Sequence, residues 1–181
     1  MRKLENEELG RLSQEEFRAV EKFPLVIVLD NIRSLNNIGS VFRTADAFRF
    51  KAIYLCGYTA TPPHREINKT ALGATETVDW RYFPTTLDAI GELKSSGYEI
   101  ISVEQAENST CLSQMKWNPE KPVALIFGNE VEGVNQSVVD ESDVVLEIPQ
   151  FGTKHSLNIA VSVGVVGWDY VDHAFTVRTG E

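Results

Sequence analysis

Short runs of consecutive apolar residues, many of them β-branched, set the strongest constraint on the fold of this chain. Residues 25–29 read Leu-Val-Ile-Val-Leu, and residues 123–127 read Val-Ala-Leu-Ile-Phe. A strand that is apolar on both faces is buried on both faces, as in parallel sheets covered by helices. Both runs are far shorter than the roughly 20 residues that cross a membrane. The sequence therefore predicts buried strands of a parallel sheet and no membrane span.

Helical and strand patterns alternate along the rest of the chain. Strands are predicted at residues 25–29, 52–56, 78–82, 98–103, 123–127 and 144–148. Helices are predicted at residues 13–22, 37–45, 86–96, 135–141 and 156–175, with a helical turn at 69–73. Ser13 and Glu16 form a capping-box pattern that opens the first helix, and residues 104–121 predict irregular structure. The alternation predicts an α/β fold with a mainly parallel sheet.

Length and cysteine content narrow the class of protein. A chain of 181 residues with 43% hydrophobic content can bury one core without disulfides. Cys56 and Cys111 are isolated, and the three histidines have no ligand spacing, so no metal site is expected. The N-terminus mixes charges without an apolar signal core, and we expect a cytoplasmic protein.

The last predicted helix is apolar on nearly every side. Its apolar positions are Ile159, Val161, Val163, Val165, Val166 and Trp168. A helix that is hydrophobic all round is buried all round, and a chain this small has little of its own to cover it. A second copy would supply the cover, and symmetric dimers are the commonest closed assembly. We therefore expect a homodimer through this helix.

The charge is unevenly distributed. The net charge is −9, which counts against a nucleic-acid ligand because phosphate contacts need Lys and Arg. Residues 33–69, however, hold six basic and two acidic side chains, a net charge of +4. This segment could form a local anion-binding face, or its charges could be scattered over the surface.

Residues 37–45 form the first candidate motif, Asn-Ile-Gly-Ser-Val-Phe-Arg-Thr-Ala, where a loop enters a helix. Gly39 permits close backbone approach, and a helix N-terminus offers free N–H groups to an anion. Arg43 lies further along the helix with a planar fork of donors that suits phosphate. The same arginine would equally serve in a surface salt bridge.

Residues 127–133, Phe-Gly-Asn-Glu-Val-Glu-Gly, follow a buried strand, where open α/β folds bind ligands. The two glycines imitate a phosphate-binding loop, but Val134-Asn135 replaces the required Lys-Ser/Thr pair, and Glu130 and Glu132 would repel phosphates. No dinucleotide fingerprint is present either. The carboxylates could hold a cationic ligand or a hydroxyl, or cap the next helix.

Residues 148–158 join the last strand to the last helix. Ser156 and Lys154 stand in no nucleophile-elbow or Ser-x-x-Lys arrangement, so a covalent nucleophile is not indicated. Serine is favoured at helix N-termini, and Ser156 as a helix cap is the local interpretation.

Together, these motifs resemble the signature of the SpoU (TrmH-like) family of SPOUT RNA 2′-O-ribose methyltransferases. The matching positions are Asn37, Gly39, Arg43, Thr44 and Ala45; Gly128, Asn129, Glu130 and Gly133; Ile148 and Pro149; and Ser156, Leu157 and Asn158. Each motif is weak alone, but their order and spacing match across roughly residues 25–170.

The resemblance implies a fold, a reaction and partners. The fold would be a single-domain α/β knot over residues 25–175, with a mainly parallel sheet and a C-terminal trefoil knot, after a helical extension at residues 1–24. S-adenosylmethionine (SAM) would be the methyl donor, without a metal. The acceptor would be a ribose 2′-hydroxyl of structured RNA, with tRNA favoured over rRNA.

The resemblance also implies roles for individual residues. Catalytic positions would be Asn37, Arg43, Glu130, Ser156 and Asn158. The cofactor would be held at Phe127, Gly128, Asn129, Ile148, Pro149 and Leu157, with backbone contacts at Gly128, Ile148 and Leu157. RNA would contact Arg33, Arg43, Arg65 and Lys69. Gln150 and the Lys154-His155 pair depart from many relatives beside the expected SAM pocket.

Two mechanistic alternatives and three rival functions stay open at this point. A guanidinium does not deprotonate in proteins, so Arg43 is expected to stabilise charge on the ribose oxygen, with Glu130 as the alternative proton acceptor. One rival is a catalytically silent SAM- or RNA-binding member of the same fold. The others are a small-molecule enzyme on an unrelated sheet and an interaction module without a ligand.

Overall fold

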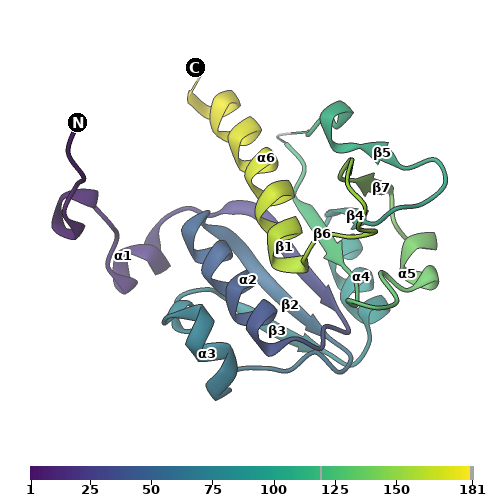
Figure 1. The fold of residues 1–181 in the computed structure, drawn as a ribbon, viewed down its shortest axis with the longest axis horizontal. Coiled ribbons are helices and arrows are strands. Elements are labelled where there is room, and N and C mark those ends of the chain that lie inside the picture. The colour runs from purple at the N-terminus through teal and green to yellow at the C-terminus, as the bar shows by residue number, and fades with distance from the viewer. Residues whose placement is uncertain (119, 180–181) are drawn as a thin grey trace.

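A seven-stranded sheet forms the centre of the protein in a computed structural model that describes residues 1–118 and 120–179 (Figure 1). The strand order is β3-β2-β1-β6-β4-β7-β5, and neighbouring strands pair in parallel throughout the described part. The strands are β1 (Phe23–Asp30), β2 (Phe50–Cys56), β3 (Trp80–Phe83), β4 (Glu99–Val103), β5 (Thr110–Cys111), β6 (Val123–Phe127) and β7 (Val144–Glu147). The predicted mainly parallel α/β sheet is confirmed.

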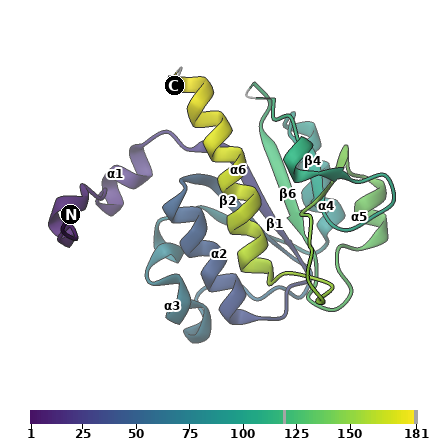
Figure 2. The ribbon, with the colours of Figure 1, turned by 45° about the horizontal axis from the view of Figure 1, so that its top comes forward.

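Helices cover both faces of this sheet. They are α1 (Gln14–Ala19), α2 (Leu35–Ala47), α3 (Arg65–Ala71), α4 (Thr86–Ser95), α5 (Gln136–Asp140) and α6 (Ile159–Thr179), with 3-10 turns η1 (Asn6–Leu9), η2 (Ala74–Glu76) and η3 (Leu112–Gln114). Helices α2, α3 and α6 lie on one face, and α4 and α5 lie on the other (Figure 2). The protein therefore has three layers with two separate cores.

Strand β1 shows why the apolar runs are continuous. Leu25, Ile27 and Leu29 point into the core shared with α2 and α6, whereas Val26 and Val28 point into the core shared with α4 and α5. Successive side chains of a strand alternate between the two faces of the sheet, and here both faces are covered. All five side chains are at most 1% exposed, which confirms the predicted burial on both faces.

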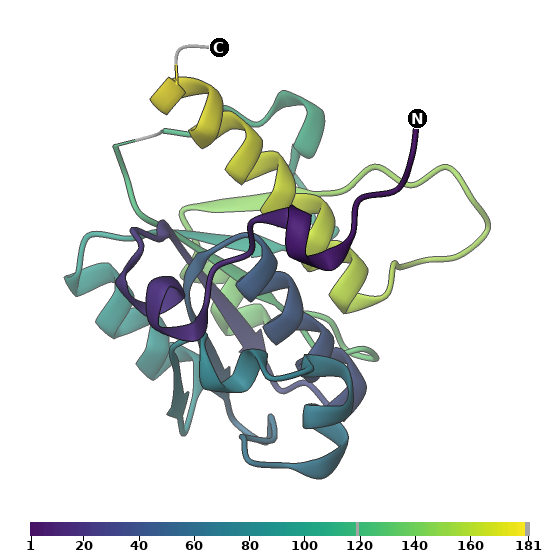
Figure 3. The same ribbon diagram turned by 90° about the vertical axis from the view of Figure 1, so that its left-hand side faces the viewer.

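The N-terminal segment reaches away from the sheet on the side of α2 (Figure 1), so it lies in front of the rest of the chain in the view of Figure 3. Its helix α1 begins after Ser13, which accepts a hydrogen bond from the Glu16 backbone in the predicted capping box. The helix ends at Ala19 instead of the expected Lys22. Phe17 is buried, and Arg18 donates to the carbonyl of Glu76, so the segment is tied to the body through α1.

Helix α3 and segment 104–121 also differ from what the sequence predicts. Helix α3 begins at Arg65, earlier than the predicted turn at residues 69–73, because the His64 side chain accepts a hydrogen bond from the Glu66 backbone and caps it. Residues 104–121 are not wholly irregular, since they include the short edge strand β5, which pairs with β7. Two-residue strands carry too little pattern to be predicted from sequence.

Helix α6 begins three residues later than expected. Asn158 caps it, because its side-chain oxygen accepts from the Ala160 N–H at 2.9 Å and its carbonyl accepts from the Ser162 N–H at 2.9 Å. Ser156 is therefore not the cap and stays in the preceding loop. No helix in residues 1–118 and 120–179 combines the length and apolarity that membrane crossing demands.

One side of α6 remains uncovered within a single chain. Six residues pack into the core, namely Ile159, Val163, Val166, Tyr170, Val171 and Ala174. The exposed apolar face of α6, made by Val161, Val165, Trp168 and Phe175, is 40–52% exposed. The expectation that the helix is covered all round therefore does not hold within one chain.

Candidate active site

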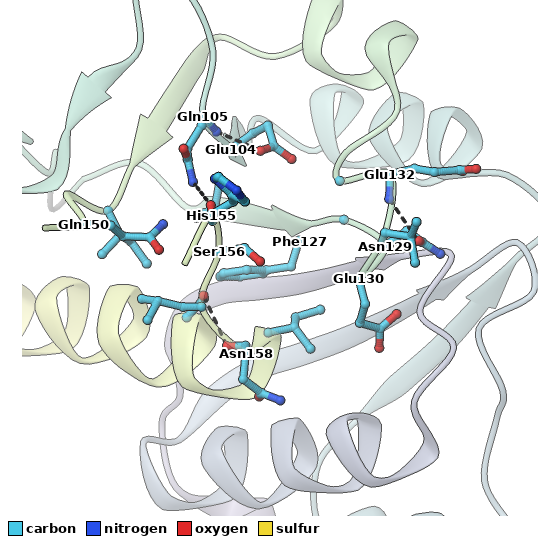
Figure 4. A pocket seen from close by; sticks show the side chains of 18 residues that line it. Glu104, Gln105, Phe127, Asn129, Glu130, Glu132, Gln150, His155, Ser156 and Asn158 are labelled. Atoms are coloured by element: carbon cyan, nitrogen blue, oxygen red, sulfur yellow. Dashed lines mark hydrogen bonds between the residues drawn. The ribbon is translucent and has the colours of Figure 1, made fainter. Parts of the chain in front are cut away.

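A cavity of about 590 Å³ opens at the carboxyl edge of the sheet (Figure 4). Three segments line it: the end of β4 at residues 103–105, the loop after β6 at 127–133, and the approach to α6 between residues 148 and 159. Ligands of open α/β sheets bind at this edge, beyond the carboxyl ends of the strands. The volume lies within the range of roughly 300–1,000 Å³ that is typical of small-molecule sites.

The loop after β6 is held in a tight shape that requires glycine at two positions. A Cβ atom on Gly128 would lie 2.0 Å from the backbone of Gly133 and Val134, and Gly133 has a φ of +72°. The backbones of Asn129 and Gly133 exchange two hydrogen bonds of 2.9 Å. The Asn129 side chain accepts from the N–H groups of Val131 and Glu132. This geometry fixes where Glu130 projects.

Glu130 points back toward the loop between β1 and α2. Its carboxylate accepts hydrogen bonds from the backbone N–H groups of Arg33 and Ser34, both at 3.1 Å, and from the Asn37 amide at 3.2 Å. Burial raises the pKa of Glu130, but these hydrogen bonds outweigh it, and the pKa lies below its ordinary value. Glu130 is therefore ionised at neutral pH and is a weaker base than an ordinary carboxylate.

Asn37 joins Glu130 to the third motif. While its side-chain nitrogen donates to Glu130, its side-chain oxygen accepts a hydrogen bond of 3.0 Å from the Asn158 amide. The two asparagines lie in the first turn of α2 and at the start of α6. A continuous hydrogen-bonded chain, Glu130 to Asn37 to Asn158, thus connects the three sequence motifs.

The loop before α6 closes one side of the cavity. The side-chain amide of Gln105 donates to the His155 carbonyl at 2.6 Å and ties this loop to the end of β4. The neighbouring Glu104 carboxylate accepts from the backbones of Gln105 and Val134, so it also holds the loop after β6. Ser156 lines the cavity, and it is exposed.

Arg43 lies apart from this cavity. It is exposed on α2 and lines a second cavity of about 460 Å³. The other residues around it are Ser40, Thr44 and Ala47 of α2, Phe48 directly after α2, Lys69 and Thr70 of α3, and Gly164 of α6. Within one chain, the structure does not bring Arg43 together with Ser156.

The predicted RNA contacts are spread over two elements and a loop. Arg43 and Lys69 share the second cavity, and Lys69 also forms an ion pair of 2.8 Å with Glu66. Arg33 lies in the loop after β1, with its guanidinium carbon 5.8 Å from the centre of the Tyr58 ring. Arg65 is exposed at the start of α3.

Most of the predicted cofactor positions come together. Phe127, Gly128, Asn129, Ile148 and Leu157 line the first cavity with the catalytic candidates Glu130, Ser156 and Asn158, whereas Pro149 does not. Asn37 reaches it through hydrogen bonds. Sequence reasoning missed Glu104 and Gln105 as lining residues. Their signal was positional, because the end of a buried strand next to β6 opens into the same crevice.

Other reactive groups lie elsewhere. No group of three His, Cys, Asp or Glu side chains suited to a metal ion occurs among the described residues. Burial raises the pKa of the Cys56 thiol to about 12. That thiol is protonated and unreactive at neutral pH.

Comparison with known proteins identifies the family. The model of the SpoU rRNA Methylase family matches residues 24–168. The chain belongs to this family. The family expected from the sequence motifs is therefore confirmed, and the SpoU match extends from β1 into α6.

Named SpoU relatives act on more than one kind of RNA. The chain is 32% identical over 143 residues to the 23S rRNA (guanosine-2′-O-)-methyltransferase RlmB of Neisseria meningitidis serogroup B, covering 79% of this chain and 56% of that protein. It is 27% identical over 143 residues to the tRNA (guanosine(18)-2′-O)-methyltransferase of Aquifex aeolicus, covering 78% and 66%. The chain thus spans less than two thirds of the length of these relatives.

A solved structure supports the same assignment. The AdoMet-bound rRNA methyltransferase from Sinorhizobium meliloti superposes with a TM-score of 0.79 at 27% identity, covering 87% of this chain and 60% of that one. The fold around the cavity is therefore shared with this rRNA methyltransferase.

Proposed function

We propose that this protein transfers a methyl group from SAM to a ribose 2′-hydroxyl of a structured RNA. The observation that carries the proposal is the hydrogen-bonded chain from Glu130 through Asn37 to Asn158. It gathers side chains from three distant segments beside a cavity of suitable size. Packing alone needs no such polar chain at the exposed carboxyl edge of a sheet, whereas a reaction site does.

The cavity suits SAM in volume and in charge. Glu104, Glu130 and Glu132 line it, and carboxylates attract a sulfonium cation but repel the phosphates of a nucleotide. We propose that Phe127, Gly128, Asn129, Ile148 and Leu157 hold the cofactor, whereas Pro149 follows Ile148 without lining the cavity. When bound, SAM would supply an electrophilic methyl group. The protein would then have to bring the ribose oxygen in line and stabilise its developing charge.

The contacts of Glu130 favour one of the two mechanistic alternatives. Its carboxylate already accepts three hydrogen bonds, and they keep its pKa low, so it is poorly suited to remove a proton from a hydroxyl. We therefore assign Glu130 and Asn37 to positioning, and charge stabilisation at the ribose oxygen to Arg43. Ser156 and Asn158 would border the reacting groups from the third segment.

Arg43 needs a second copy of the chain to reach a reaction centre. The cavity around Arg43 includes Gly164 of α6, and the exposed apolar face of α6 lies on the same helix. We propose that two chains pair through α6, so that Arg43 of one copy meets the cofactor cavity of the other. The uncovered face supports this pairing, because exposed apolar patches mark interfaces.

The RNA would approach over the basic residues of segment 33–69. Arg33, Arg43, Arg65 and Lys69 are the proposed contacts. We propose tRNA over rRNA as the substrate, with the basic side chains of this segment contacting its phosphates. We also propose that the segment before α6 forms the trefoil knot implied by the family resemblance.

A catalytically silent SAM- or RNA-binding protein is the second candidate. The separation of Arg43 from the first cavity favours it if the chain acts as a monomer. Under that alternative, SAM would bind normally but no methyl group would move.

The deciding experiment is transfer of labelled methyl from SAM to separate pools of tRNA and rRNA, followed by nuclease mapping. Label on a 2′-O-methylated nucleotide supports the proposal and names the RNA. SAM binding without transfer to either pool favours the silent protein. Absence of SAM binding overturns the proposed methyl transfer, and absence of both SAM and RNA binding overturns the silent protein as well.

A further inference from the structure

Tyr58 is an aromatic residue held beside the candidate active site while much of its surface is open to solvent. Its backbone N–H donates to the Asn31 side chain at 3.2 Å. Its hydroxyl accepts a hydrogen bond from the amide of Asn129, a buried residue of the loop that carries Glu130. Tyr58 is nevertheless 54% exposed. The ring is therefore anchored at both ends and still accessible to a ligand.

Arg33 joins this ring to the active-site carboxylate. Its guanidinium carbon lies 5.8 Å from the centre of the Tyr58 ring, and its backbone N–H donates to Glu130 at 3.1 Å. An aromatic ring, a cation and Glu130 thus lie next to one another on the side of the site that faces the basic segment. Such a combination suits a nucleotide, which offers a flat base and a negative phosphate.

The backbone beneath Tyr58 is fixed by two adjacent strands. Arg33 follows β1 and Tyr58 follows β2, and Asp30 pairs with Cys56 at the ends of these strands. Gly57 has a φ of +63°, and a Cβ there would lie 2.0 Å from the side-chain oxygen of Asn31. The ring is consequently held by close packing of two turns. Because the ring is already fixed, it loses little further conformational entropy when a ligand stacks on it.

We propose that Tyr58 and Arg33 form a subsite for a nucleotide that flanks the methylated ribose. The base stacks on the exposed face of Tyr58, and the Arg33 guanidinium contacts its phosphate. This inference rests on the proposed methyl transfer to RNA, and it adds a second position at which the protein binds the RNA strand. Stacking accepts any base, so the subsite holds the strand without reading its sequence.

Two substitutions distinguish the contribution of the Tyr58 ring to RNA binding from the contribution of its hydroxyl. Tyr58→Leu removes both, whereas Tyr58→Phe keeps the ring and loses only the bond to Asn129. Tyr82→Leu is the matched control, because Tyr82 is 49% exposed on β3 and its hydroxyl donates to the Gly57 carbonyl instead of the Glu130 loop. Affinity for bulk tRNA and for bulk rRNA would be measured by fluorescence anisotropy, and affinity for SAM by calorimetry.

We expect Tyr58→Leu to weaken RNA affinity by about tenfold, the size of one lost base stack. SAM affinity should stay within about twofold of the wild type, Tyr58→Phe should recover most of the RNA affinity, and Tyr82→Leu should change little.

Equal weakening by Tyr58→Phe and Tyr58→Leu would overturn the subsite, because it would show that the hydroxyl acts only by holding Asn129. Unchanged RNA affinity in Tyr58→Leu, with methylation by the wild type intact, would overturn the subsite and leave the proposed function standing. A wild type that binds neither SAM nor RNA would overturn both.

Discussion

Asn37 and Asn158 are 121 positions apart in the chain, yet their side chains share a hydrogen bond of 3.0 Å. Asn37 lies where α2 begins and Asn158 lies where α6 begins. Their bond therefore holds the N-terminal ends of these two helices together beside the cavity. Asn37 uses its other side-chain atom to bond Glu130. Loss of either asparagine would therefore free the carboxylate from the third segment.

The single variants Asn37→Ala and Asn158→Ala are each expected to lower kcat of methyl transfer strongly. The double variant should lose less than the sum of the two, with a coupling energy of about 0.5–3 kcal/mol for groups in one hydrogen-bonded network. Single-turnover rates and thermal melts of all four proteins measure this. Full additivity would show that the two residues act independently.

Arg43→Ala is expected to abolish methylation while SAM affinity stays nearly unchanged, because the proposed role of Arg43 is to stabilise charge on the ribose oxygen and not to hold the cofactor. Arg43→Lys should restore little, since the guanidinium fork differs from a point charge. Parallel calorimetry and methyl-transfer assays test this. Equal loss of binding and activity would mean that Arg43 maintains the pocket.

Two inactive variants are expected to restore activity when mixed. If Arg43 serves the cavity of the other copy, a mixed dimer of Arg43→Ala and Asn158→Ala contains one intact site. Random mixing then gives about one quarter of wild-type activity. Trp168→Glu, on the exposed apolar face of α6, should give a monomer in sedimentation and no activity. A mixture that stays inactive would place Arg43 and Asn158 in the same chain's site.

The lowered pKa of Glu130 predicts a pH effect on stability. Its folded-state pKa lies below the ordinary value of 4.5, so its contribution is present above pH 4.5 and is lost as the pH falls through the folded-state pKa. The melting temperature of the wild type should therefore fall more steeply with acidification than that of Glu130→Gln. Identical pH profiles of the two melting temperatures would contradict a lowered pKa of Glu130 in the folded protein.

Gly128→Ala is expected to destabilise the loop after β6 and to weaken SAM binding, because its Cβ would lie 2.0 Å from backbone atoms. Gly91→Ala is the matched control. Gly91 lies within α4 with open space around it, and alanine there should stabilise the protein by about 0.5–1 kcal/mol. Chemical denaturation and calorimetry measure both effects. Unchanged stability and SAM affinity in Gly128→Ala would mean that the loop after β6 can shift to accommodate the added Cβ atom.

Local patterns were sufficient for the buried strands, whereas most of the residues that line the cavity were predicted from the family resemblance. The alternation within β1 and the apolar run of β6 follow directly from burial on both faces. Residues such as Gly128 and Glu130 were predicted by the family motifs together with their place after a strand. These features depend on residues close together in the chain.

The features that could not be predicted depend on distant partners. The contact of Gln105 with His155 joins segments 50 positions apart, and no local pattern in either segment predicts the contact. The start of α6 depends on whether Ser156 or Asn158 caps it, and both residue types cap helices well. The place of Arg43 outside the first cavity follows from how α2 packs against α3 and α6, which no motif encodes.

The position of β6 has a consequence for synthesis on the ribosome. This strand lies between β1 and β4, although both precede it in the chain. Until residue 127 has emerged, β1 and β4 lack their common neighbour, and both present unpaired backbone edges. The nascent chain consequently cannot close its sheet until β6 has been made. Pairing between strands that are distant in sequence is intrinsically slow to form, so the strand order favours slow folding with edges exposed to aggregation in the meantime.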